Sequence, residues 1–187
     1  MKTLIIPGIS NSGPDHWQTH WEHLHSFTRI QQKEWENPVY ADWEASLLEQ
    51  ILNSPSQQNF LVGHSLGCLL IGKALLKIQD RIQGILLVAP PDPKSDVFPK
   101  GLTDFQTFPK ENLGIPGLIL YSENDPFATV SYSETLASNW GLQSINLGRL
   151  GHINSESNLG AWDTGYKIYS TFVQDLLSKR SVSNSTK

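Results

Sequence analysis

Residues 60–67 of this sequence, FLVGHSLG, place a glycine-flanked serine directly after a short apolar run. The residues that follow have helical spacing, with apolar side chains at positions 66, 70, 74 and 78. A strand that passes at once into an amphipathic helix needs a sharp turn at Ser65, and Gly63 and Gly67 leave room for that turn. The pattern G-x-S-x-G alone is weak, but this context makes it a candidate strand–turn–helix serine site.

Further apolar runs occur on both sides of this segment and predict the rest of the sheet. They lie at residues 4–6, 85–88 and 118–121. A further strand is expected around residues 144–147, and the polar stretch 28–35 forms an edge strand at best. Amphipathic segments separate the runs. Non-alternating apolar strands joined by helices predict an α/β fold, with a mainly parallel sheet of about six strands covered by helices on both faces.

The first two predicted helices are defined by their apolar faces. Asp15 is expected to cap a helix that buries Trp17, Trp21 and Leu24. A second helix is expected to bury positions 43, 47 and 51. Later helices are expected over residues 129–140, ending near Gly141, and from position 162 onward, with apolar residues continuing to 176.

The chain of 187 residues fits one domain with a substantial core. We expect that domain to span residues 1–179, and the Ser-, Asn- and Lys-containing tail 180–187 to be disordered. Residues 89–114 have no clear period. They are expected to form a variable excursion over the site, and the sequence does not show whether it acts as a mobile flap.

Composition excludes several classes of partner. The net charge is −4, so the clustered basic residues that nucleic acid binding requires are not expected. No run approaches the roughly 18 apolar residues of a membrane span, so no membrane partner is expected. The single cysteine, Cys68, precludes an internal disulfide and favours a cytoplasmic location. Nothing in the sequence indicates a protein partner.

The serine at position 65 suits nucleophilic catalysis if a base and an orienting acid lie at neighbouring strand ends. A serine hydroxyl needs both groups to react at neutral pH. His152 is the only histidine downstream of Ser65, and it follows a predicted strand in a glycine-flanked loop. Asp125 follows the strand before it and is the favoured acid. Other groups after strand ends are weaker candidates: Glu123, Asn124 and Asp92.

Two backbone amides are expected to stabilise the oxyanion of the reaction. One belongs to Leu66, directly after the serine, and the other to the loop after the first strand. Ile9 is the first choice in that loop and Ser10 the second. Gly8 lets this backbone approach closely. The sequence does not identify substrate-binding residues.

Three histidines on the first predicted helix raise a metal-binding alternative. His16, His20 and His23 have the spacing i, i+4, i+7, which could bind zinc. No glutamate lies between the first two in the H-E-x-x-H arrangement, so a solvated helix face is the favoured interpretation. We therefore predict neither a metal nor an organic cofactor.

Residues 3–178 resemble the small, lidless serine hydrolases of the α/β-hydrolase fold, a family that includes a retinoblastoma-binding protein and short bacterial proteins. The matching stretches are Ile6-Pro7-Gly8, Asp15-His16-Trp17, Trp35 with Pro38 and Trp43, residues 63–67, Asp125-Pro126-Phe127, and Gly151-His152-Ile153-Asn154 leading to Trp162. The resemblance implies a trimmed α/β-hydrolase fold that lacks the first two strands, and a triad at Ser65, Asp125 and His152. Asp163 follows Trp162 where the family commonly has proline. The family implies no settled physiological substrate.

The residues and the resemblance together predict a serine hydrolase. The expected substrate is a small carboxylic ester, thioester or activated amide, cleaved through an acyl-enzyme. The alternative is a protein-binding module on a catalytically silent hydrolase scaffold, which would capture its partner equally well after Ser65→Ala.

Overall fold

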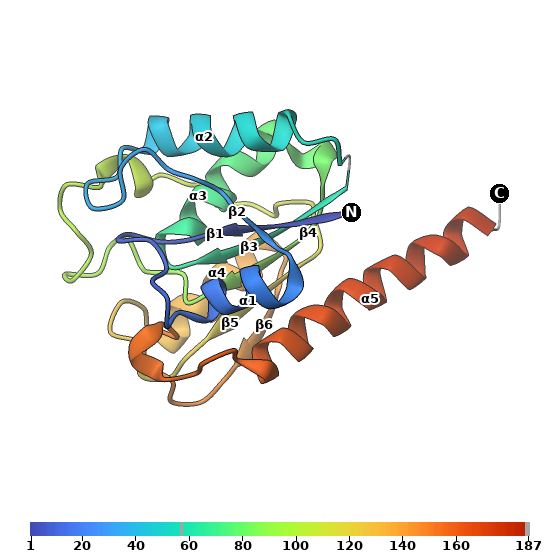
Figure 1. Ribbon diagram of the computed structural model, residues 1–187. Helices are drawn as coiled ribbons and strands as arrows, with labels where there is room; N and C mark the ends of the chain where they lie inside the picture. Colours follow the sequence, from blue (N-terminus) through green and yellow to red (C-terminus); the bar gives the residue numbers. More distant parts are fainter. Residues whose placement is uncertain (57, 186–187) are drawn as a thin grey trace.

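The computed structural model describes residues 1–56 and 58–185, and it contains one six-stranded sheet between two layers of helices (Figure 1). The strands are β1 (Lys2–Ile6), β2 (Thr28–Arg29), β3 (Asn59–His64), β4 (Ile82–Val88), β5 (Gly117–Tyr121) and β6 (Gln143–Asn146). The α-helices are α1 (Trp17–His25), α2 (Tyr40–Leu52), α3 (Leu66–Ala74), α4 (Val130–Trp140) and α5 (Asp163–Ser185). Short 3₁₀ turns lie at Leu75–Lys77, Gln79–Arg81, Thr103–Phe105 and Ser155–Ser157.

All five strand pairs are parallel, in the order β2-β1-β3-β4-β5-β6. This order confirms the predicted parallel sheet of six strands. The segment around 28–35 contributes only the two-residue edge strand β2, paired with β1. Since all the strands run in one direction, the loops after their carboxyl ends gather at one rim of the sheet.

Side chains alternate between the two faces of the sheet and form two separate cores. Leu61 and Ile85 point to one face and belong to a cluster with α2, α3 and α4. Val62 and Leu86 point to the other face and pack with α1 and α5. The predicted cover of helices on both faces is therefore confirmed.

The start of α1 differs from the prediction. Its N-cap is His16 rather than Asp15, and the imidazole Nδ1 accepts a hydrogen bond from the Gln18 N–H at 3.1 Å. Trp17 and Trp21 are buried as expected. Leu24 was expected to be buried with them, but it lies in the last turn of the helix and is 61% exposed.

The segment 89–114 contains only the turn Thr103–Phe105, and buried Phe98, Leu102 and Phe105 fasten it to the core. At the other end of the chain, α5 continues to Ser185, past Lys179, where we expected the ordered chain to end. Residues 186–187 of the expected disordered tail lie outside the described residues. None of the described helices has both the length and the apolar composition needed to span a bilayer.

Candidate active site

Ser65 lies in the turn between β3 and α3, in a strained backbone conformation with φ 52° and ψ −125°. Close packing around the turn explains its glycines. A Cβ on Gly67 would lie 2.2 Å from the Ile6 carbonyl oxygen, and one on Gly63 would lie 2.7 Å from Ile71 Cδ1. Such strain costs about 1–3 kcal/mol and persists only where the surroundings impose it. The turn holds the Ser65 hydroxyl at the carboxyl rim of the sheet.

The structure brings the three predicted residues together in one hydrogen-bonded chain. The Ser65 Oγ lies 2.8 Å from His152 Nε2, and His152 Nδ1 lies 2.9 Å from both carboxylate oxygens of Asp125. The Asp125 and His152 side chains are only 2% and 10% exposed. With Asp125 as acceptor, the neutral imidazole carries its proton on Nδ1 and presents a lone pair on Nε2 to the serine.

The carboxylate of Asp125 is itself oriented, since its Oδ1 accepts a hydrogen bond from the Phe127 N–H at 2.9 Å. The competing groups are used elsewhere. Asn124 Oδ1 accepts hydrogen bonds from the Ser122 hydroxyl and the Gly151 N–H. Glu123 Oε1 accepts one from the Asn146 side chain. Asp92 Oδ1 accepts one from the Lys94 N–H.

The loop that carries His152 is anchored by bonds from distant elements. His64, the residue before the serine, places Nε2 at 2.9 Å from the His152 carbonyl oxygen and donates to it. Trp17 donates its indole N–H to the Ile153 carbonyl at 2.8 Å. Ile153 has φ 50° and Gly151 has φ 60°, so the loop turns sharply on both sides of the histidine. These contacts fix the backbone of His152 relative to β3.

The loop after β1 passes directly beside Ser65. A Cβ on Gly8 would lie 2.8 Å from Ser65 Cβ and 3.3 Å from the Leu66 nitrogen, so glycine is required for this approach. The Ser10 N–H donates to the Trp35 carbonyl at 3.0 Å. Among the backbone hydrogen bonds of the described turns, loops and caps, none is donated by the amide of Ile9 or Leu66.

A cavity of about 470 Å³ opens onto the serine and the histidine. One part of its wall is apolar, with Phe98, Pro99 and Phe127, and another part is polar. The full lining is Ile9, Ser10, Asn11, Gly13, His16, His64, Ser65, Leu66, Pro91, Phe98, Pro99, Phe127, His152, Asn154, Ser155 and Glu156. Both residues proposed for the oxyanion amides, Ile9 and Leu66, are among them.

His16 and His64 form a buried pair beside His152. Their ring centroids lie 4.8 Å apart, and the His64 and His152 rings lie 5.0 Å apart. Burial, reinforced by the positive charge of Arg29, lowers the pKa of His16 to about 3. Burial also holds the pKa of His64 well below its usual range. Both rings are therefore neutral near pH 7. A neutral His16 can accept the hydrogen bond from the Gln18 N–H, and a neutral His64 can donate to the His152 carbonyl.

The depressed pKa of His16 predicts a loss of stability in acid. Between pH 6.5 and about 3 the unfolded chain binds a proton at this position that the folded chain does not, so stability falls as pH falls, by up to about 1.4 kcal/mol per pH unit. His16→Asn keeps an N-cap acceptor without the titration. From pH 7 to 5, urea unfolding should show the wild type losing up to about 2 kcal/mol more than this variant. Equal losses would contradict the prediction.

The three histidines at positions 16, 20 and 23 differ in their surroundings. His16 is buried at the cap, whereas His23 is exposed and His20 is half-buried. Across the described residues, no group of three or more His, Cys, Asp or Glu side chains is arranged to hold a metal ion. Cys68 is buried, and burial raises the pKa of its thiol, so it is an unreactive packing residue.

Two residues of the site's surroundings were not predicted from the sequence. Arg29 was passed over within the polar stretch 28–35, yet its buried side chain contacts the loop after β1. Asn154 follows the histidine and caps the turn Ser155–Ser157, which forms part of the cavity wall. The sequence offered two signals for Asn154: it is a turn-forming residue two positions after His152, and it lies in the stretch Gly151–Asn154 that resembles the family.

Comparison with known proteins places this geometry in context. A family model described as serine hydrolase matches residues 3–171. A YdeN-like hydrolase of Pectobacterium atrosepticum is similar in structure, with a TM-score of 0.84, 29% identity, and coverage of 94% of this chain and 91% of that one. No match was found among curated protein sequences.

Two more distant structures share the fold. The ydeN gene product of B. subtilis has a TM-score of 0.73 at 20% identity, with 93% of this chain and 100% of that one covered. An α/β superfamily hydrolase of Oenococcus oeni has a TM-score of 0.69 at 14% identity, with 94% and 92% covered. The chain has the α/β-hydrolase fold, and since the family match spans most of its length, it belongs to the serine hydrolase family.

Proposed function

We propose that the protein hydrolyses small carboxylic esters, thioesters or activated amides through an acyl-enzyme on Ser65. The observation that supports this most directly is the continuous chain of hydrogen bonds from the Ser65 hydroxyl through His152 to Asp125. This chain ends at a cavity large enough for a small substrate. A base in contact with the hydroxyl and an acid that fixes the imidazole tautomer are the two groups a serine nucleophile needs.

In the acylation step, the Ser65 Oγ attacks the carbonyl carbon while its proton passes to His152 Nε2. The tetrahedral intermediate collapses when His152 returns that proton to the leaving group, which departs as an alcohol, thiol or amine. Water then attacks the acyl-serine and loses a proton to His152. When the second intermediate collapses, His152 returns that proton to the Ser65 Oγ, which releases the acid and restores the serine. Asp125 stays ionised and stabilises the imidazolium that forms twice in each cycle.

The negative oxygen of each intermediate is assigned to the amides of Leu66 and Ile9. Leu66 N–H begins α3, where the helix dipole favours negative charge. Ile9 is preferred to Ser10, because the Ser10 amide is already bonded to the Trp35 carbonyl. The short distance between Gly8 and Ser65 brings this loop to the reacting serine.

Labelling with a fluorophosphonate probe tests the proposal. The wild type should be labelled at one site, and Ser65→Ala should not be labelled. The labelled wild type should also lose its turnover of p-nitrophenyl esters. An unlabelled wild type that turns over no ester would count decisively against the proposed chemistry.

Short acyl chains should be the better substrates. The cavity of about 470 Å³ must hold the acyl group and part of the leaving group, and buried Phe98 closes its apolar wall. Methylenes beyond the cavity stay in water and gain no burial. We therefore expect kcat/KM for p-nitrophenyl laurate to be no higher than that for the acetate or butyrate. Faster turnover of the laurate would contradict this expectation.

A further inference from the structure

We propose that Arg29 is a positioning residue for the oxyanion hole: its buried guanidinium fixes the loop 8–13 that presents the Ile9 amide to the reacting carbonyl. The inference rests on the proposed function, because it concerns the second amide donor of that mechanism. Arg29 does not line the cavity, so it acts through the loop rather than on the substrate.

The loop needs an external support. Ser10 has φ 63° and Asn11 has φ 60°, two consecutive left-handed residues of which neither is glycine. Such residues are strained, and they persist only where surrounding contacts impose them. Ile9 directly precedes this pair. If the pair relaxed to ordinary backbone angles, the path of the loop past Ser65 would change, and the Ile9 N–H with it.

The guanidinium supplies that support. Nη1 donates to the Asn11 side-chain oxygen and to the Ser12 carbonyl, both at 2.8 Å, so a single nitrogen holds two successive loop residues. Nη2 donates to the Thr19 hydroxyl at 2.6 Å, and that hydroxyl donates to the same Ser12 carbonyl at 2.9 Å. The Arg29 side chain is 8% exposed, which strengthens these charge-assisted bonds.

The place of Arg29 in the sheet directs its side chain to the loop. Arg29 pairs with Ile5 in the register of β1 and β2, and β1 runs directly into the loop. Gln18 adds a second tie on the other side. It accepts from the Ser12 hydroxyl at 2.6 Å and donates to the Val62 carbonyl of β3, the strand that ends directly before Ser65. The position of the loop is therefore fixed relative to both β1 and β3.

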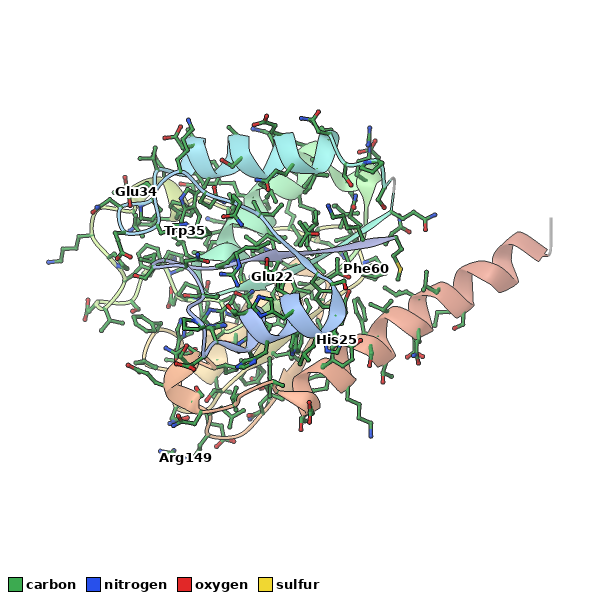
Figure 2. All side chains as sticks on the ribbon, in the orientation of Figure 1. Glu22, His25, Glu34, Trp35, Phe60 and Arg149 are labelled. Atoms are coloured by element: carbon green, nitrogen blue, oxygen red, sulfur yellow. The ribbon has the colours of Figure 1, made fainter. Side chains whose placement is uncertain are left out.

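A purely structural role is the competing explanation, since Arg29 also forms an ion pair with Glu22 of α1 at 2.8 Å. Glu22 is labelled in Figure 2. The two roles use different bonds. Glu22→Gln weakens the ion pair and leaves the bonds to Asn11 and Ser12 in place, so it is the matched control. Arg29→Lys keeps the positive charge, but a single ammonium cannot reproduce the planar fork.

The experiment measures kcat and KM on p-nitrophenyl acetate, the inhibition constant of a small alkylboronic acid, and the melting temperature. The boronate forms a tetrahedral adduct on a serine and so reports on the oxyanion hole. For Arg29→Met and Arg29→Lys we expect kcat to fall by about 10- to 100-fold, with KM changed less than about threefold. Boronate affinity should weaken by a similar factor. Glu22→Gln should stay within about threefold of wild type in all three constants.

A second pair of variants tests the loop contact itself and remains informative if the Arg29 variants do not fold. Asn11→Gly tolerates the left-handed backbone but removes the oxygen that Arg29 contacts, and kcat should fall about tenfold. Asn11→Asp keeps that oxygen, so its kcat should fall less than that of Asn11→Gly. Equal kcat in these two variants would overturn the inference.

The outcomes separate this inference from the proposed function. Arg29 variants that melt earlier but keep wild-type kcat and boronate affinity show a structural role only, and the inference fails alone. A wild type that turns over no ester and is not labelled by fluorophosphonate overturns the proposed function and this inference with it.

Discussion

Replacing Ser65 by alanine is expected to lower kcat by about 10⁶-fold, to the level left by substrate binding and the backbone amides alone. His152→Ala should cost about as much, because the hydroxyl 2.8 Å from its Nε2 then has no base to take its proton. The double variant should be no slower than either single one. Ser65 and His152 take part in the same proton transfer, so removing either one abolishes it, and removing the second lowers kcat no further.

The measurement is kcat on p-nitrophenyl acetate for the four proteins at equal, verified folding. His20→Ala is the matched histidine control: it removes a half-buried imidazole from α1, outside the cavity lining, and should keep kcat within about twofold. A Ser65→Ala variant within about tenfold of wild type would show that the turnover does not pass through this serine.

The strand–turn–helix at 60–67 could be predicted because all of its determinants are local. The apolar run, the two glycines and the helical spacing after Ser65 lie within one short window, and steric contact explains each of them. Asp125 and His152 could be predicted because parallel strands deliver their following loops to one rim. Chain order and strand ends favoured Asp125 but left Glu123 and Asp92 open, and the contact with the His152 imidazole distinguishes Asp125 from them.

The start of α1 could not be predicted in the same way. Asp15 is the better cap by intrinsic preference, yet the structure uses the imidazole of His16. A histidine accepts a backbone hydrogen bond only while that nitrogen is unprotonated, and here burial near Arg29 secures the neutral state. That condition depends on tertiary packing. No pattern of neighbouring residues reports it.

Arg29 was missed for a related reason. It lies in a two-residue edge strand within a polar stretch, which in sequence is indistinguishable from a solvated surface. Its contacts reach back to Asn11, Ser12 and Thr19, and only the pairing of β2 with β1 brings these residues together. The choice between Ile9 and Ser10 likewise needed the Trp35 carbonyl, which lies far along the chain.

Asp125→Asn is expected to lower kcat by about 10⁴-fold while the fold is preserved. The substitution keeps the shape of the side chain, and its amide oxygen can still accept the Phe127 N–H. The amide nitrogen then donates to His152 Nδ1 and stabilises the tautomer that carries its proton on Nε2. An imidazole in that state cannot accept the proton of the Ser65 hydroxyl, so binding persists and the chemical step fails.

The same substitution at the competing positions separates this effect from a general loss of carboxylate charge. Glu123→Gln and Asp92→Asn each neutralise a carboxylate near a strand end, but these groups bond to the Asn146 side chain and the Lys94 amide rather than to the imidazole. Both variants should keep kcat within about threefold of wild type on p-nitrophenyl acetate. A deficit at Glu123 or Asp92 that matches the one at Asp125 would mean that these carboxylates act through the electrostatic field of the site, and that the bonds at 2.9 Å do not select the tautomer of His152.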